Sequence, residues 1–267
     1  MPRYFLEVAY KGTKYSGFQI QENSNTVQSE IAKALDIFLS DSTPPQNHCP
    51  AQDEKGLKLT GSSRTDAGVH ALQNFFHFDT ILPLHLWRGV ESEAKFIYKM
   101  NAVLPQDIVV KNLCSMPDAA HSRFDVVSRE YEYHIYRRKD PFLREIAFYY
   151  PYKMDTDLLN EAALFILNQR NFFAFTKTNT QAKNFDCTVW ISQWILMDDS
   201  IVYNIRANRF LRGMVRLLTG AMLQVARKKI SIQEFHNFFN AHGKCGFSVP
   251  PQGLFLKAVK YPENYFL

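Results

Sequence analysis

Two segments in which large apolar residues alternate with polar or small ones constrain the fold of this chain most. They are Arg3–Tyr10 and Ser128–Tyr136. Alternation with a period of two is typical of a β-strand that buries one face. Each segment opens the same series of expected elements, in the order strand, helix, strand, strand, helix, strand.

The elements of the first series are a helix capped by Asn25 or Thr26 that runs to residue 39, the stretch 59–79 with a strand at 73–79, a helix around 91–101, and a strand at 108–116. Those of the second are a helix opened by Asp155 or Thr156 that runs to about 167, strands at 187–197 and 201–207, helices at 210–227 and from 231 to His242-Gly243, and a strand at 254–261. This order predicts an α+β fold of two ferredoxin-like (βαββαβ) halves, residues 1–118 and 119–267. We expect one mainly antiparallel sheet with helices on one face. Residues 41–58 have no periodicity and are expected to form a long loop or insertion.

Composition agrees with a large folded protein that has an anionic partner. The 267 residues are 46% hydrophobic, and the net charge is +5. Such a mild basic bias is compatible with RNA binding. Cys49, Cys114, Cys187 and Cys245 are far apart in the sequence, which favours reduced thiols in a cytoplasmic protein. No apolar run approaches the length of a membrane span, and the first strand begins too early to leave room for a signal peptide.

The stretch 59–79, LTGSSRTDAGVHALQNFFHFD, contains the strongest candidate for chemistry. Arg64 and Asp66 are two residues apart, so an extended backbone projects them to the same face. Gly61 and Gly68 bracket them and permit tight turns or close approach of a ligand. A carboxylate beside a cation stays ionised at neutral pH, which suits a nucleophile or an electrostatic stabiliser. Taken alone, the motif fits a surface ion pair in which Asp66 caps a turn better than it fits a catalytic site.

Five segments, in order, resemble the TruA-type tRNA pseudouridine synthases. The likeness covers nearly the whole chain, and its centre is GSSRTDAGVHA at 61–71. The other segments are YKGTKYSGFQ at 10–19, NAVLP at 101–105 followed by Asp107-Ile108, HSRF at 121–124 followed by REYEY at 129–133, and FLRGMVR at 210–216 with GLFL at 253–256.

The resemblance implies a cofactor-free isomerase that converts uridines at positions 38 to 40 of the tRNA anticodon stem-loop to pseudouridine. It implies a homodimer and a basic cleft between the two halves. Matched position by position, Asp66 takes the place of the catalytic aspartate and Tyr131 that of the substrate-contacting tyrosine. Arg216 takes the place of the arginine that pairs with the aspartate, and Arg64 is the signature arginine.

The chain departs from the family pattern in four places. Ser62-Ser63 replaces a common Ala-Gly, and Phe18 replaces a frequent Trp. Gln169-Arg170 interrupts a turn that usually contains glycine, and the 41–58 connection is long. These departures bear on substrate contacts more than on the proposed chemistry.

The residues leave the first chemical step open. Asp66 could attack C1′, attack C6, or abstract the proton that starts glycal formation. A reaction that keeps its base needs one carboxylate and a dry pocket, which we expect Phe75, Phe76 and Phe78 to wall. No metal site is expected, because the eight histidines are scattered.

Two other functions fit parts of the pattern. A non-catalytic RNA-binding module of the same fold would carry stacking aromatics such as Tyr131 and Tyr133 on an open sheet face, although core packing explains each tyrosine as well. A nucleoside hydrolase would also use a single carboxylate. Candidate phosphate contacts are Lys11, Lys14, Arg137, Arg138, Arg227, Lys228 and Lys229.

Overall fold

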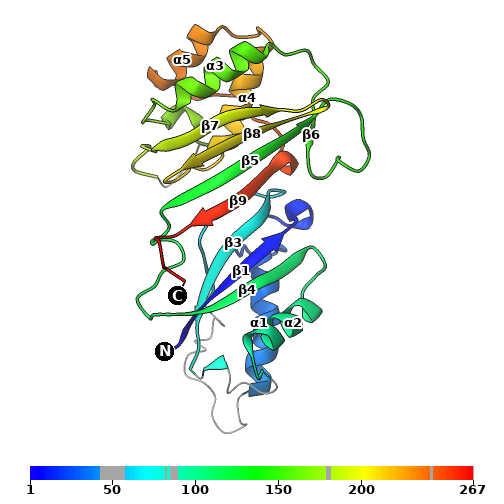
Figure 1. The fold of residues 1–267 in the computed structure, drawn as a ribbon, viewed down its shortest axis with the longest axis vertical. Coiled ribbons are helices and arrows are strands. Elements are labelled where there is room, and N and C mark those ends of the chain that lie inside the picture. Colours follow the sequence, from blue (N-terminus) through cyan, green and yellow to red (C-terminus); the bar gives the residue numbers. More distant parts are fainter. Residues whose placement is uncertain (43–57, 82, 85–89, 179–181, 241–242, 267) are drawn as a thin grey trace. The chain divides into compact units, whose positions relative to one another are not determined.

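The computed structural model describes residues 1–42, 58–81, 83–84, 90–178, 182–240 and 243–266. These residues form a mixed α+β protein with nine strands and five α-helices. They divide into two compact units, Met1–Val126 with Val259–Leu267 (unit 1) and Val127–Ala258 (unit 2) (Figure 1).

The sheet of unit 1 is built around β1 (Arg3–Tyr10), whose predicted bounds are confirmed. β1 pairs antiparallel with β4 (Ile108–Met116) on one side and with β3 (His70–Asp79) on the other. The two-residue strand β2 (Thr60–Gly61) pairs with β3. The order within the unit is therefore β4-β1-β3, with β2 on the far side of β3.

Two helices, α1 (Val27–Ser42) and α2 (Glu93–Val103), cover one face of this sheet (Figure 1). Thr26 caps α1 as predicted, since its Oγ1 accepts from the Ser29 backbone N–H at 3.2 Å. Ser92 caps α2 in the same manner through the Lys95 N–H. Both caps satisfy backbone donors that a helix start leaves unpaired.

In unit 2, β5 (Ser128–Tyr136) pairs antiparallel with β8 (Ser200–Ala207), and β8 pairs with β7 (Val189–Leu196). The short strand β6 (Phe148–Tyr149) runs parallel to β5. β9 (Leu254–Lys260) also neighbours β5. The bounds of β5 and β4 match the prediction residue for residue.

The helices of unit 2 lie together on one face of its sheet: α3 (Thr156–Ile166), α4 (Met214–Ala226) and α5 (Ile232–Asn240) (Figure 1). The Asp155 side chain caps α3. α4 is buried along nearly its whole length. A helix with such a wide apolar surface is stabilised mainly by tertiary packing.

Two predicted boundaries moved for identifiable reasons. The helix expected at 210–227 begins only at Met214, because Gly213 takes the left-handed conformation with φ of 77°. The strand expected from residue 73 begins at His70, because Ala71 already pairs with Tyr10. The predicted insertion lies almost wholly outside the described residues.

The compact units also differ from the expected halves, residues 1–118 and 119–267. The change of unit falls after Val126, because the turn at 121–125 is hydrogen-bonded into unit 1. Residues from Val259 onward belong to unit 1 as well, because Tyr261 and Phe266 pack on Phe75.

Candidate active site

The segment that carries the candidate carboxylate alternates in exposure as an extended chain should. Ser63 and Thr65 are buried, Arg64 is exposed, and Asp66 is half-buried. Arg64 and Asp66 therefore share the outward face of this segment. Both belong to unit 1.

A buried polar network holds the inward face of the segment. Asn74 on β3 donates through Nδ2 to the Ser63 carbonyl at 3.1 Å and to Tyr10 Oη at 3.2 Å. Its Oδ1 accepts from Ser62 Oγ at 2.6 Å. Tyr10 Oη in turn lies 2.8 Å from Thr65 Oγ1. The Ser62 and Ser63 side chains, which depart from the family pattern, are thus buried in the protein interior.

The loop after β1 clamps the backbone of the same segment. The Phe18 N–H donates to the Thr65 carbonyl at 3.1 Å. Gly17 has φ of 106°, and a Cβ there would lie 3.1 Å from the Thr65 carbonyl oxygen. Only glycine fits this left-handed position at such a close approach. The loop after β1, which resembles the family's first loop, therefore holds the backbone of the segment that carries Asp66.

Asp66 opens a tight turn. The Val69 N–H donates to the Asp66 carbonyl at 3.1 Å, and Gly68 has φ of 77°. Glycine at the third position of a turn supplies a positive φ at no steric cost. The turn leads directly into β3, so the Asp66 backbone is fixed on both sides.

Arg64 has a second arginine as its electrostatic neighbour. Partial burial, and then the positive charge of Arg123, lower the pKa of the Arg64 guanidinium below its ordinary value. Sequence reasoning missed Arg123. It stands in the HSRF segment, 59 residues further along, and only the tertiary structure brings the two charges together.

The expected phenylalanine walls are part of the core instead. Phe76 and Phe78 are fully buried, and Phe76 stacks on Phe18 with ring centroids 4.9 Å apart. Phe75 on the opposite face packs edge-on against Tyr261 at 5.3 Å. The expectation was wrong because both faces of β3 are already covered within unit 1.

Tyr131 and Tyr133 lie on the buried face of β5 in unit 2. Tyr131 is 8% exposed and packs edge-to-face on Phe210 with centroids 5.0 Å apart. Tyr133 is fully buried, and its hydroxyl donates to the Pro250 carbonyl at 2.8 Å. Burial raises the pKa of the Tyr133 phenol. For Tyr133, the structure therefore confirms core packing, the interpretation that stood beside stacking on an open face.

Arg216 on α4 is anchored by the chain that precedes β9. Its Nε donates to the Val249 carbonyl at 2.7 Å, and its own carbonyl accepts from the Val249 N–H at 3.3 Å. The Arg216 charge acts on the phenol of Tyr133 and opposes the rise of that pKa. Tyr131 and Arg216 thus both belong to unit 2, as Arg64 and Asp66 belong to unit 1.

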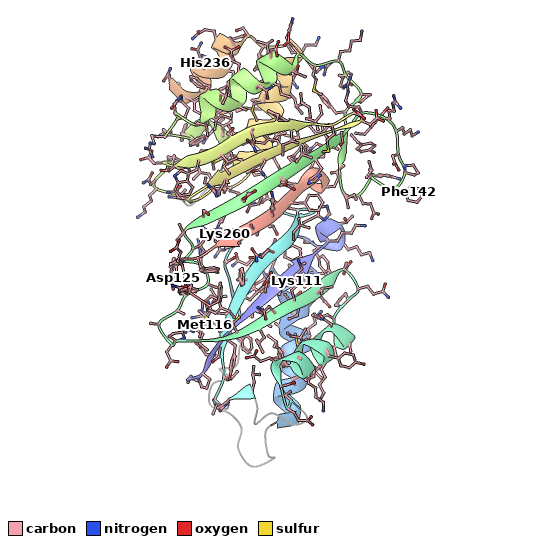
Figure 2. All side chains as sticks on the ribbon, in the orientation of Figure 1. Lys111, Met116, Asp125, Phe142, His236 and Lys260 are labelled. Atoms are coloured by element: carbon pink, nitrogen blue, oxygen red, sulfur yellow. The ribbon has the colours of Figure 1, made fainter. Side chains whose placement is uncertain are left out.

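Several of the candidate phosphate contacts are engaged within the protein. Lys14 pairs with Asp107 at 3.7 Å, Arg138 with Asp199 at 3.0 Å, and Lys228 with Asp155 at 3.0 Å. Arg227 lies over the Tyr152 ring at 3.8 Å. Arg137 and Arg138 flank a loop from which Phe142, 87% exposed, projects (Figure 2).

Neither a metal centre nor a membrane segment is found in the described part of the chain. Within it, no three histidine, cysteine, aspartate or glutamate side chains come together in a group that could hold a metal ion. Its helices are all too short or too polar to cross a bilayer.

Comparisons with known proteins identify the class. A family model described as tRNA pseudouridine synthase matches residues 169–262. The tRNA pseudouridine synthase A of Parabacteroides distasonis is 37% identical over 100% of this chain and 98% of its own length. That of Bacteroides fragilis is 37% identical over 99% and 98%, and one from Staphylococcus aureus is 31% identical over 99% and 93%. Pseudouridine synthases are isomerases. The chain belongs to the tRNA pseudouridine synthase A family.

Proposed function

We propose that this protein converts uridines at positions 38 to 40 of the tRNA anticodon stem-loop to pseudouridine, with Asp66 as the catalytic carboxylate. One observation carries the assignment of Asp66. The segment that bears it is fixed from within by Asn74, Tyr10 and Thr65, while Asp66 itself lies on the outward face. A catalytic group gains most when its position is set before the substrate binds.

The chemistry requires no net oxidation or addition. The N1–C1′ bond of uridine breaks, the uracil turns, and a C5–C1′ bond forms. C5 then loses its proton, and N1 ends up carrying one. A single carboxylate can start this sequence, whereas a hydrolase usually employs a second one to activate water.

The other site residues bind and position the substrate. Arg64 contacts the RNA backbone beside Asp66. Tyr131 contacts the uracil after the nucleotide leaves the base stack, and Arg216 has the role of the family's arginine partner of the catalytic aspartate. These roles come from the family resemblance. The exposure of Arg64 and the anchoring of Arg216 by Val249 support them.

Substitution of Asp66 tests the proposal. Asp66→Asn keeps the shape of the side chain and removes its charge, so tritium release from 5-tritiated tRNA should fall to background while tRNA binding changes little. Asp118→Asn is the matched control, because Asp118 is an exposed aspartate of the same unit that pairs with the N-terminus. Turnover by Asp66→Asn above background would refute the assignment. Free uracil in the reaction of the wild-type protein would indicate a hydrolase. If the wild-type protein binds tRNA but releases no tritium, it is a non-catalytic RNA-binding module.

We also propose a fold for each unit and an oligomeric state for the protein. We assign each unit a ferredoxin-like fold, supported by the strand orders β4-β1-β3-β2 and β9-β5-β8-β7. The working unit is a homodimer in the cytoplasm that binds tRNA and needs no cofactor. Sedimentation equilibrium with and without tRNA tests the dimer.

A further inference from the structure

An exposed aromatic side chain stands on the turn at residues 121–125 of unit 1. Phe124 is 74% exposed. The His121 ring lies 4.2 Å from it between centroids, tilted by 31°. The Arg123 guanidinium carbon lies 5.8 Å from the centroid of the Phe124 ring. The turn thus offers an aromatic face with a cation beside it.

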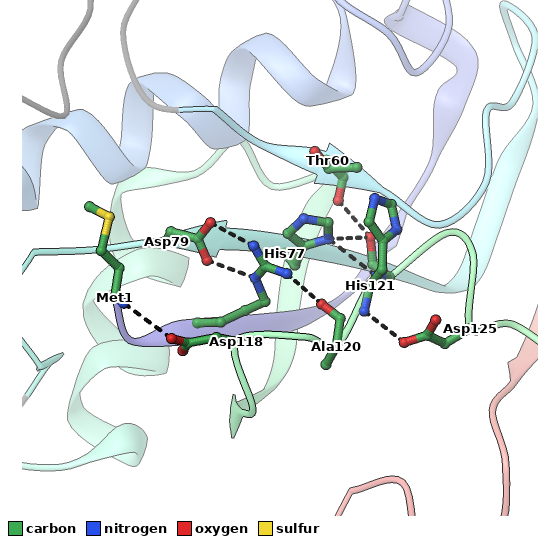
Figure 3. A network of polar contacts seen from close by, with 10 residues as sticks. Met1, Thr60, His77, Asp79, Asp118, Ala120, His121 and Asp125 are labelled. Carbon is green, nitrogen blue, oxygen red and sulfur yellow. Dashed lines mark hydrogen bonds and ion pairs between the residues drawn. The ribbon is translucent and has the colours of Figure 1, made fainter.

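Hydrogen bonds within the turn fix its shape. The His121 N–H donates to Asp125 Oδ2 at 2.7 Å, and the Asp125 N–H donates to the His121 carbonyl at 3.2 Å. Tyr265 from the C-terminal segment donates through its hydroxyl to Asp125 Oδ2 at 2.6 Å. Figure 3 shows the contact between His121 and Asp125 together with the network beneath the turn.

Ser122 anchors the turn to the sheet. Its side chain is fully buried, with Oγ 2.9 Å from the Thr60 carbonyl oxygen and 2.8 Å from His77 Nδ1. Tyr261 donates through its hydroxyl to the Ser122 carbonyl at 2.5 Å. The turn is therefore attached to β2, to β3 and to the C-terminal segment. This anchoring orients an exposed Phe124 that contributes little to the core.

The charges around the turn favour an anion. Arg123 acts electrostatically on Arg64, which stands two residues before Asp66. Two neighbouring acidic groups are engaged within the protein: Asp125 with Tyr265, and Asp79 with both Nε and a terminal nitrogen of Arg3 at 2.7 Å. The positive charges of Arg64 and Arg123 oppose each other, and a phosphate bound to both would relieve that opposition.

Resting on the proposed function, we propose that the 121–125 turn is an RNA-binding element of the active site. Arg123 and Arg64 hold the same phosphate of the substrate RNA, and Phe124 stacks on an unpaired base beside it. Single-stranded RNA is bound in this way elsewhere, by aromatic side chains combined with phosphate-binding cations. The element would align the RNA with the Asp66 segment.

Binding measurements on two variants test the element. Arg123→Ala should weaken tRNA binding by about 3- to 10-fold at moderate salt and make the plot of log affinity against log salt shallower by about 0.7 to 0.9. Phe124→Ala should weaken binding by about 10-fold and leave that slope unchanged, because stacking releases no counterions. In both variants the loss should fall mainly on the dissociation constant rather than on the single-turnover rate with saturating tRNA.

Matched controls exist in the same unit. Lys33→Ala removes one exposed charge from α1, where Lys33 pairs with Glu30. Tyr98→Ala removes an aromatic side chain that is 76% exposed on α2. Both should bind tRNA like the wild type. Equal losses in the controls and the turn variants would refute a specific element.

A double variant tests the shared phosphate. If Arg64 and Arg123 hold one phosphate, the loss in Arg64→Ala/Arg123→Ala should be smaller than the product of the two single losses. Multiplicative losses would overturn the shared contact. Thermal unfolding of each variant, with midpoints close to that of the wild type, ensures that a binding loss reports on RNA contacts.

The two proposals fail in different ways. If the wild-type protein releases tritium, but Arg123→Ala and Phe124→Ala bind tRNA as tightly as it does, the RNA element is refuted and the proposed function stands. Weakened binding by both variants, without tritium release by the wild type, would refute the proposed function and leave the element standing.

Discussion

At the scale of single residues, Asn74 connects the segment of the candidate carboxylate to β1 and β3. It is fully buried and contacts Ser62, Ser63 and Tyr10 through three hydrogen bonds. A buried polar group that loses its partner costs more free energy than the lost bond is worth. Asn74 therefore couples stability to the position of the Asp66 segment.

Replacing Asn74 by alanine should lower the free energy of unfolding by about 2–4 kcal/mol, because it leaves the Ser63 carbonyl and the Ser62 hydroxyl without this partner. Tritium release should also slow at a temperature where the variant is folded, because the backbone before Asp66 loses its support. Urea unfolding and single-turnover assays measure the two effects. Asn112→Ala is the control, since Asn112 is exposed and its Oδ1 accepts from the adjacent Leu113 N–H. If Asn74→Ala loses no more unfolding free energy than Asn112→Ala, the stabilising role of the Asn74 network is refuted.

At the scale of secondary-structure elements, α4 shows packing prevailing over local propensity. Gly220 lies inside this helix, where glycine is about 1 kcal/mol less favourable than alanine. A Cβ at Gly220, however, would lie 2.4 Å from the Phe247 carbonyl oxygen. The glycine allows the chain at 247–249 to pack directly on the helix that carries Arg216.

Gly220→Ala distinguishes helix propensity from packing by the sign of the change in the free energy of unfolding. Propensity alone would raise the free energy of unfolding, whereas the clash should lower it by about 1–3 kcal/mol. Urea unfolding gives the sign. Gly246→Ala should change stability little, because nothing lies within 4 Å of a Cβ there. A stabilised Gly220→Ala variant would show that the backbone at Phe247 gives way.

At the scale of the whole molecule, buried and half-buried histidines couple stability to pH. Burial is the largest cause of the lowered pKa values of His77, His121 and His134. For His77, burial and the nearby Arg3 charge lower the pKa to about 4. The unfolded chain binds a proton near pH 6.5, whereas the folded protein resists protonation. The stability is thus fully present above pH 6.5 and is lost as the pH falls toward 4.

His77→Gln should flatten this dependence. Between pH 7 and pH 5 the wild type should lose about 1–2 kcal/mol more unfolding free energy than the variant, because one pKa unit corresponds to about 1.4 kcal/mol. Urea titrations of both proteins at several pH values give the difference directly. Parallel curves would show that His77 takes up its proton equally in both states. The pKa of His77 also depends on the charges of other groups: Arg3, His121, Asp79 and Lys58. The difference in unfolding free energy between the two proteins is therefore the quantity to measure.

The elements whose signals are local follow from the sequence alone. Alternation set the bounds of β1 and β5, and the side chains of Thr26 and Asp155 set the starts of two helices. Strand alternation and helix caps depend on neighbours a few residues away, so the chain carries them in its own order. The Asp66 motif could be found for a similar reason, because a family signature is a contiguous string.

Which side chains share a surface depends on the tertiary structure. It buried Tyr133 and the β3 phenylalanines, brought Val259–Leu267 into unit 1, and placed the Arg123 charge near Arg64. Burial, pKa shifts and charge pairs depend on residues tens to hundreds of positions apart, which no local pattern reports. For the same reason, the sequence pointed to Asp66 but not to the Asn74 network that holds it or to the turn that presents Phe124.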